Sequence, residues 1–148
     1  MLTMDEFIRT CREKGLNVTY QRMVIYKSLM HSKNHPTAEE IYHMVRKEYP
    51  SISLATVYKT LETFAELKII NKVTHLHDMA RYDADTRPHH HMICVYCKAV
   101  QDVHDERLNR LPMPDMNYNG FQITGYSIQF EGVCVACAQK FQRKASSN

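Results

Sequence analysis

The sequence lacks a long apolar run, and it carries no strong excess of either charge. No stretch approaches the ~18 apolar residues of a membrane-spanning helix. Residues 1–10 contain Asp5, Glu6 and Arg9, whereas a signal peptide needs an uninterrupted apolar segment. The formal net charge of +3 is too small to indicate a nucleic-acid partner by itself. We therefore expect a cytoplasmic protein that does not associate with membranes.

The sequence also has no internal repeat and none of the compositional extremes of disordered or coiled-coil chains. It has 148 residues, of which 44% are hydrophobic and 24% charged, as in an ordinary globular protein. This length suffices for one ordinary domain or two small ones, so a large multi-domain enzyme is excluded.

Helix-start signals recur in the first half of the chain. Thr19 is a candidate N-cap, Thr37 and Glu40 have the spacing of a capping box, and Ser53 can cap a further helix. Apolar residues follow each of these positions at helical spacing. The first half is therefore predicted to be mainly helical.

The helix predicted after Ser53 has two different faces. One face is apolar, and the other presents small or hydrogen-bonding residues beside one cation: Ala55, Thr56, Lys59 and Thr63, with Tyr58 at the margin. An ordinary solvated surface would explain this face if the helix stood alone. However, a second helix precedes it closely and strands are predicted over 69–77 and 80–84, which is the order of a winged helix-turn-helix. This order predicts that the polar face enters a DNA groove and that Lys72 and Arg81 of the wing lie near phosphates.

Four of the five cysteines form two CxxC pairs, Cys94/Cys97 and Cys134/Cys137, and Cys11 stands alone. A reducing cytosol disfavours permanent disulfides, and two CxxC pairs supply the four thiolates that a structural Zn²⁺ prefers. Redox-active pairs and inert buried thiols are the alternatives. We expect the zinc to hold a small domain together and Cys11 to pack in a core.

A second group of donors contains only nitrogen and oxygen. Residues 89–91 are all histidine and lie in a predicted strand, whose alternation puts His89 and His91 on one face. Residues that can complete such a site are His35, Asp83, Asp85, Asp102, His104 and Asp105. Donors of this kind suit Fe²⁺, Mn²⁺ or Zn²⁺ at an exchangeable site. A polar surface cluster of histidines is the alternative.

Several motifs in one order resemble the ferric uptake regulator family, and they extend over nearly the whole chain. They are Thr19-Tyr20-Gln21-Arg22, His35-Pro36-Thr37-Ala38, Ser53-Leu54-Ala55-Thr56-Val57-Tyr58, Arg81-Tyr82-Asp83, His89-His90-His91-Met92-Ile93-Cys94-x-x-Cys97 and Gly132-Val133-Cys134-x-x-Cys137. The combination is highly specific, although each motif alone is weak.

This resemblance implies an α+β protein that represses transcription as a homodimer on double-stranded operator DNA. A winged helix-turn-helix domain is expected over residues 1–84, followed by a small α/β dimerisation and metal-binding domain over 85–148. The four paired cysteines match the family's structural zinc site. Predicted DNA contacts are Thr19, Gln21, Arg22, Ala55, Thr56, Tyr58, Lys59, Lys72 and Arg81.

The resemblance also implies a regulatory Fe²⁺ or Mn²⁺ site between the two domains. Its expected ligands are His35, Asp83, His89, His91 and Asp102. Asp102 stands where iron-sensing relatives usually have glutamate, so the chain is most similar to the peroxide-stress regulator type. Peroxide would then act through iron-catalysed oxidation of His35 or His89.

Two other functions stay open at this stage. An iron-responsive repressor would use Fe²⁺ only as corepressor. A small non-haem metalloenzyme could use His89, His91 and Asp102 as a facial triad, but the sequence shows no phosphate loop or general base that would support it. We therefore expect a regulator and not an enzyme.

Overall fold

The computed structural model describes residues 1–32, 34–73, 80–112, 117–118, 120–123 and 125–145. The chain divides into two compact units, Met1–Arg87 and Pro88–Asn148, so the division lies three residues beyond the predicted one. No helix of the described part is long and apolar enough to cross a membrane.

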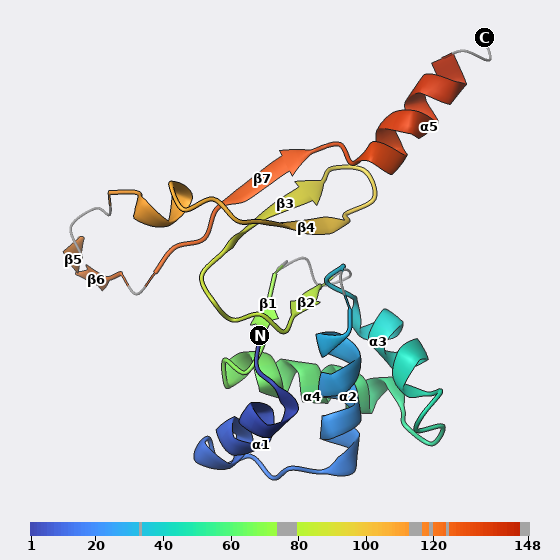
Figure 1. Cartoon of the computed structure of the whole chain (residues 1–148), viewed down its shortest axis with the longest axis vertical. Coiled ribbons are helices and arrows are strands. Elements are labelled where there is room, and N and C mark those ends of the chain that lie inside the picture. Colours follow the sequence, from blue (N-terminus) through green and yellow to red (C-terminus); the bar gives the residue numbers. More distant parts are fainter. Residues whose placement is uncertain (33, 74–79, 113–116, 119, 124, 146–148) are drawn as a thin grey trace. The chain divides into compact units, whose positions relative to one another are not determined.

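The first unit begins with four helices (Figure 1), namely α1 (Met4–Glu13), α2 (Tyr20–Met30), α3 (Ala38–Val45) and α4 (Leu54–Glu66). Each begins at a capping side chain. Thr19 and Ser53 accept hydrogen bonds from the backbone three residues ahead, and Thr37 forms a full capping box with Glu40. The predicted helix starts are therefore confirmed.

An aromatic cluster fixes the packing of these helices. The rings of Phe7 and Tyr26 stack with centroids 4.0 Å apart, and Phe64 of α4 meets Phe7 edge-on at 5.4 Å. Cys11 is fully buried in this core, as predicted. Because Val57 and Leu61 of α4 are also fully buried, the opposite face of α4 is left outside the core.

A two-stranded antiparallel ribbon closes the first unit. Strand β1 (Asn71–Lys72) pairs with β2 (Tyr82–Asp83), and Lys72 lies opposite Tyr82. Both strands are shorter than predicted: Ile69 and Ile70 are buried but lie outside β1. The last part of the predicted first strand, residues 74–77, lies outside the described residues.

The second unit is built on a three-stranded sheet with the order β4-β3-β7 (Figure 1). Strand β3 (His90–Cys94) pairs antiparallel with β4 (Val100–Val103) and parallel with β7 (Gln129–Gly132), which leads into helix α5 (Val135–Ala145). A short second ribbon joins β5 (Asn117–Tyr118) to β6 (Phe121–Gln122).

The sequence also predicts a short helix over 105–111 and a strand over 121–130 in which Gly125 marks a bulge or bend, and the structure differs from both predictions in extent. The predicted helix over 105–111 is reduced to a single 3₁₀ turn, Leu108–Arg110. Among the described residues of the predicted strand over 121–130, only its two ends lie in strands, and the interruption includes Gly125. The mixture of a helical first unit and a sheet-based second unit agrees with the predicted α+β class.

Candidate metal centres and DNA-binding surface

The four paired cysteines converge in the second unit. Strand β7 runs parallel to β3 with Gly132 opposite Cys94, so the chain returns the second pair to the end of the strand that carries the first. The four Sγ atoms all lie within 4.8 Å of one another. The Sγ atoms of Cys97 and Cys134 are 3.6 Å apart, far beyond the ~2.05 Å of a disulfide. Thiolates at about 2.3 Å from a tetrahedral zinc ion lie about 3.8 Å apart, so the cluster fits Zn²⁺.

Backbone geometry prepares this cluster for a cation. Backbone N–H groups of Cys134 and Cys97 donate to the Cys94 sulfur and lower the pKa of this thiol to about 6. Burial raises the pKa of the Cys137 thiol. Cys134 and Cys137 also lie at the N-terminus of α5, where the helix dipole favours negative charge. Metal binding is expected to release thiol protons, because the ligand is the thiolate.

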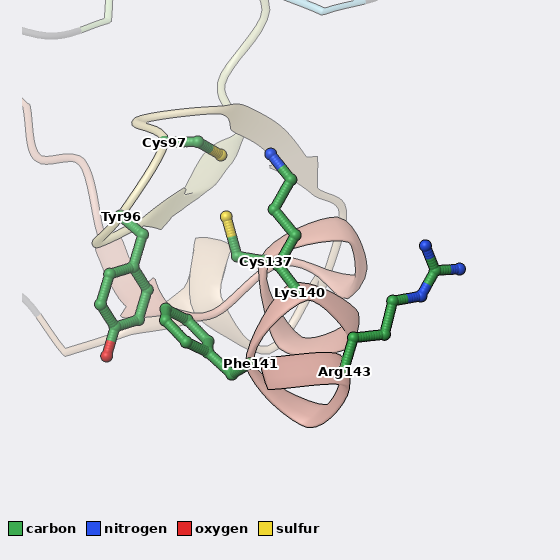
Figure 2. A pocket seen from close by; sticks show the side chains of 6 residues that line it. All are labelled: Tyr96, Cys97, Cys137, Lys140, Phe141 and Arg143. Carbon is green, nitrogen blue, oxygen red and sulfur yellow. The ribbon is translucent and has the colours of Figure 1, made fainter. Parts of the chain in front are cut away.

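Aromatic and cationic side chains surround one side of the cysteine cluster (Figure 2). Tyr96 and Phe141 pack with ring centroids 4.6 Å apart. With Lys140 and Arg143 they line a pocket of about 440 Å³ whose wall includes Cys97 and Cys137. Lys140 and Arg143 thus place two positive charges on the wall of a pocket that includes two of the cysteines, and four thiolates with a Zn²⁺ ion would carry two net negative charges. Sequence reasoning missed these cations because nothing in the CxxC spacing indicates them.

Nitrogen and oxygen donors gather on another part of the same sheet. His91 of β3 lies opposite Asp102 of β4, and His89 immediately precedes β3. The Nε2 atoms of His89 and His91 lie 3.4 Å and 3.6 Å from Asp102 Oδ1. The two imidazole rings are 4.6 Å apart and both are largely shielded from solvent.

The neighbouring candidates are arranged differently. His90 faces away from this group: its Nδ1 accepts a hydrogen bond from the Ile128 backbone and its ring stacks on Tyr126. His104 is exposed, with Nε2 3.9 Å from the other Asp102 oxygen. Asp105 forms a two-oxygen ion pair with Arg107. Alternation along β3 therefore separates His90 from His89 and His91, as predicted.

The first unit contains a second, smaller set of donors. His35, in the connection between α2 and α3, is buried, and its Nε2 lies 3.5 Å from Oδ2 of Asp83 in β2. The other Asp83 oxygen accepts a hydrogen bond from the Asp85 backbone, which fixes the carboxylate. Asp85 itself pairs with Arg87 and the N-terminal ammonium group, and these contacts lower the pKa of its carboxyl group.

Both nitrogen and oxygen sets fit a divalent first-row metal ion. Their separations of 3.4–3.6 Å are longer than good hydrogen bonds. Two donors at about 2.0–2.2 Å from one ion lie about 2.8–3.6 Å apart for bond angles between 90° and tetrahedral. Each set also combines imidazole with carboxylate, which suits Fe²⁺, Mn²⁺ or Zn²⁺.

The polar face of α4 is the most accessible part of the predicted DNA contact. Ala55 and Lys59 are exposed, and Thr56 and Tyr58 are half-buried. The Tyr58 hydroxyl donates a short hydrogen bond to Glu39 of α3, and Thr56 exchanges a hydrogen bond with the Ser53 cap. Because the apolar side of α4 forms the core, these side chains are fixed in orientation by the packing of the helix.

The other predicted contacts have intramolecular partners. Thr19 caps α2, and the side chains of Gln21 and Arg22 donate to the Tyr49 hydroxyl and the Asn17 carbonyl. Lys72 forms a 2.9 Å ion pair with Glu62.

Arg81 differs from its predicted environment. It is only 9% exposed, and its Nη1 donates to the His35 carbonyl. An antiparallel bridge between the backbones of Thr37 and Arg81 holds Arg81 beside the start of α3. A phosphate contact needs an exposed cation, so the burial of Arg81 does not suit the predicted contact.

The sequence and the fold are both similar to those of known proteins. The model of the ferric uptake regulator family matches residues 13–131. The peroxide-responsive repressor PerR of Staphylococcus aureus is 33% identical over 137 residues, which cover 93% of each chain. The crystal structure of the Campylobacter jejuni peroxide stress regulator is 28% identical with a TM-score of 0.66, covering 93% of this chain and all of that one. A zinc-bound manganese uptake regulator has the same identity and TM-score, with coverage of 90% and 100%.

These likenesses confirm the predicted α+β architecture with its four-cysteine zinc site. The cysteine cluster and the nitrogen and oxygen donor sets agree with the expectation of two kinds of metal site, and one relative is a zinc-bound manganese uptake regulator.

Proposed function

Because this chain belongs to the ferric uptake regulator family and is a metal-dependent repressor of the peroxide-responsive type, we propose that it releases its operator when peroxide oxidises a metal-ligating histidine. The observation that carries this proposal is the presence of nitrogen and oxygen donors in both units, at separations within each unit that suit ligands of one divalent ion. His35 and Asp83 supply the donors of the first unit, and His89, His91 and Asp102 supply those of the second.

We propose that the two donor sets bind the same ion. An ion held by both units fixes their relative orientation and so selects a DNA-binding arrangement from the conformations that the chain samples. Moving that equilibrium from 1:99 to 99:1 requires about 5.5 kcal/mol of differential affinity, a modest demand when several ligands are gained together. Metal loading is therefore expected to increase operator affinity.

Fe²⁺ held by these ligands would supply the redox chemistry that activates the O–O bond of H₂O₂. The imidazole rings of His35 and His89 are the proposed targets, because both are metal donors by resemblance and both are buried beside a carboxylate. Transfer of one oxygen atom from H₂O₂ to a ring carbon leaves one molecule of water. The oxidised ring is a weaker donor, so the link between the two units is lost and the operator is released.

The DNA contact is proposed to centre on α4. Ala55, Thr56, Tyr58 and Lys59 present a methyl group, two hydroxyl groups and one cation to a major groove, and Lys72 supplies a phosphate contact from the ribbon. In a symmetric dimer the two α4 helices read half-sites about 34 Å apart, one turn of DNA. The protein acts in the cytoplasm, where its operator DNA lies, and it has a regulatory and not an enzymatic role.

The second unit has the features of a homodimer interface. Within the described part of the sheet, β7 pairs only with β3, which leaves its other edge for a partner strand. Apolar side chains on and near β7 are exposed, with Phe130 at 41%, Val133 at 49% and Val135 at 73%. A second copy of the chain would cover both the edge and these side chains.

The decisive experiment measures operator binding by the Fe²⁺ and Mn²⁺ forms before and after H₂O₂ treatment, followed by peptide mass spectrometry. We expect release only from the Fe²⁺ form, together with the gain of one oxygen atom in a peptide that contains His35 or His89. The Mn²⁺ form is the matched control. Oxidation confined to cysteine or methionine would contradict the proposal, and operator binding lost on chelation but insensitive to peroxide would favour an iron-responsive repressor.

A further inference from the structure

The Arg81 side chain contacts both the α2–α3 connection, which contains His35, and the first turn of α3. Its Nη1 donates a 2.9 Å hydrogen bond to the His35 carbonyl and lies 3.6 Å from Oε2 of Glu40. The Arg81 side chain is 11% exposed, so this ion pair is shielded on one side. Charge-assisted contacts of a guanidinium are strong and directional, and a lysine ammonium does not reproduce their geometry.

The backbone of His35 needs such support. His35 has φ +43°, in the left-handed region that is unfavourable for a non-glycine residue. Two hydrogen bonds to consecutive carbonyls support this conformation: Arg81 donates to the carbonyl of His35, and the Tyr82 backbone donates to the carbonyl of Pro36. The same strand carries Asp83, so the two donors of the first unit are held together by these bonds.

Glu40 connects this arrangement to α3. It occupies the third helical position, and its carboxylate accepts a 2.8 Å hydrogen bond from the Thr37 backbone while it faces Arg81. The adjacent residue, Glu39, accepts the hydrogen bond from Tyr58 on the polar face of α4. This hydrogen bond holds the Glu39 carboxyl group charged and lowers its pKa.

We propose that Arg81 is a positioning residue that couples the metal ligand His35 to Tyr58 of the DNA-contacting helix, through Glu40 and Glu39 at the start of α3. The inference rests on the proposed function, because it takes His35 as a ligand of the regulatory ion. It adds that metal binding acts on the orientation of a DNA-contacting side chain inside the first unit, in addition to any effect on how the two units are arranged.

The test measures the metal activation ratio, defined as the operator Kd of zinc-loaded protein without Mn²⁺ divided by the Kd with saturating Mn²⁺. Arg81→Lys keeps the positive charge but removes the planar guanidinium group, which contacts the His35 carbonyl and Glu40 together. Glu40→Gln removes the ion pair while glutamine still serves the capping box, so this variant is expected to fold. We expect each to lower the ratio at least about fivefold, the low end of typical couplings. Metal-free operator affinity should stay near that of the wild type.

Two comparisons separate coupling from a structural effect. Arg46→Lys makes the same substitution at the exposed C-terminus of α3, where Arg46 stacks on Tyr42, and it should leave the ratio unchanged. Glu39→Gln combined with Arg81→Lys should lower the ratio no further than Arg81→Lys alone, because both changes interrupt one connection. By linkage, operator DNA should raise Mn²⁺ affinity in the wild type by the same factor as the ratio, and by less in Arg81→Lys.

A wild-type ratio in both Arg81→Lys and Glu40→Gln would overturn the inference while leaving the proposed function intact. Equal weakening of the metal-free and Mn²⁺ forms would also overturn it, since that result indicates a purely structural role. If the wild type itself shows no dependence on Mn²⁺, the proposed function is wrong and the coupling with it.

Discussion

Replacing Cys97 with serine should unfold the second unit and leave the first intact. The reason is the difference between their cores. The first unit buries a large connected set of aliphatic and aromatic side chains around Phe7, Tyr26 and Phe64. In the described part of the second unit, the buried apolar side chains are Ile93 and Val100 together with two of the cysteines.

Zinc binding outweighs apolar burial in the stability of the second unit. Full burial of an isoleucine or valine contributes about 1.5–3 kcal/mol, so Ile93 and Val100 together supply about 3–6 kcal/mol. Structural Zn²⁺ supplies roughly 10–16 kcal/mol of apparent binding free energy in small zinc domains. Loss of one of four thiolates removes much of that contribution, and the apolar burial that remains cannot replace it.

Hydrogen exchange resolved by peptide is the appropriate assay, because it reports the two units separately. In Cys97→Ser, and in wild-type protein stripped by a strong chelator, amides of β3, β4 and β7 should exchange at the rate of an unfolded chain. Those of α2 and α4 should keep their protection. Cys11→Ala, which removes a thiol outside the cluster, should leave the second unit protected. Native protection of β3 in zinc-free protein would show that zinc does not hold this unit together.

Three further outcomes are expected. Thr37→Ala removes the N-cap of α3 and should lower the free energy of unfolding by about 1 kcal/mol in urea titrations, whereas no loss would show that Glu40 alone maintains the helix start. Lys59→Ala should change the relative affinities for operator variants and Lys72→Ala should weaken all of them alike, as measured by competition binding; the reverse pattern would contradict the assignment. Asp102→Glu, which lengthens a carboxylate 3.4 Å from His89, should keep Mn²⁺-dependent operator binding but reduce histidine oxidation in the Fe²⁺ form, and unchanged oxidation would show that carboxylate length is irrelevant.

The helices could be predicted from the sequence because their signals are local. A capping side chain, its partner three residues on, and an apolar stripe all lie within a few residues of one another, as at Thr37 and Glu40. The alternation that separates His90 from His89 and His91 is local in the same sense. These features depend on backbone periodicity, which the sequence displays directly.

Features that depend on residues far apart in the sequence were harder to predict. The CxxC spacing predicts a shared ion, but only the parallel pairing of β3 with β7 explains how Cys134 returns across the intervening residues. Arg81 has the sequence context of a wing cation, yet its hydrogen bond to a residue 46 positions away draws it inside. The predicted strand after residue 121 breaks because alternation favours a strand without supplying a neighbour to pair with.

A crystal structure of the Mn²⁺-loaded protein would decide whether one regulatory ion is bound by both units. We expect a single Mn²⁺ coordinated by His35 and Asp83 together with His89, His91 and Asp102. A Mn²⁺ ion bound by the second unit alone, with His35 outside its coordination shell, would contradict this expectation.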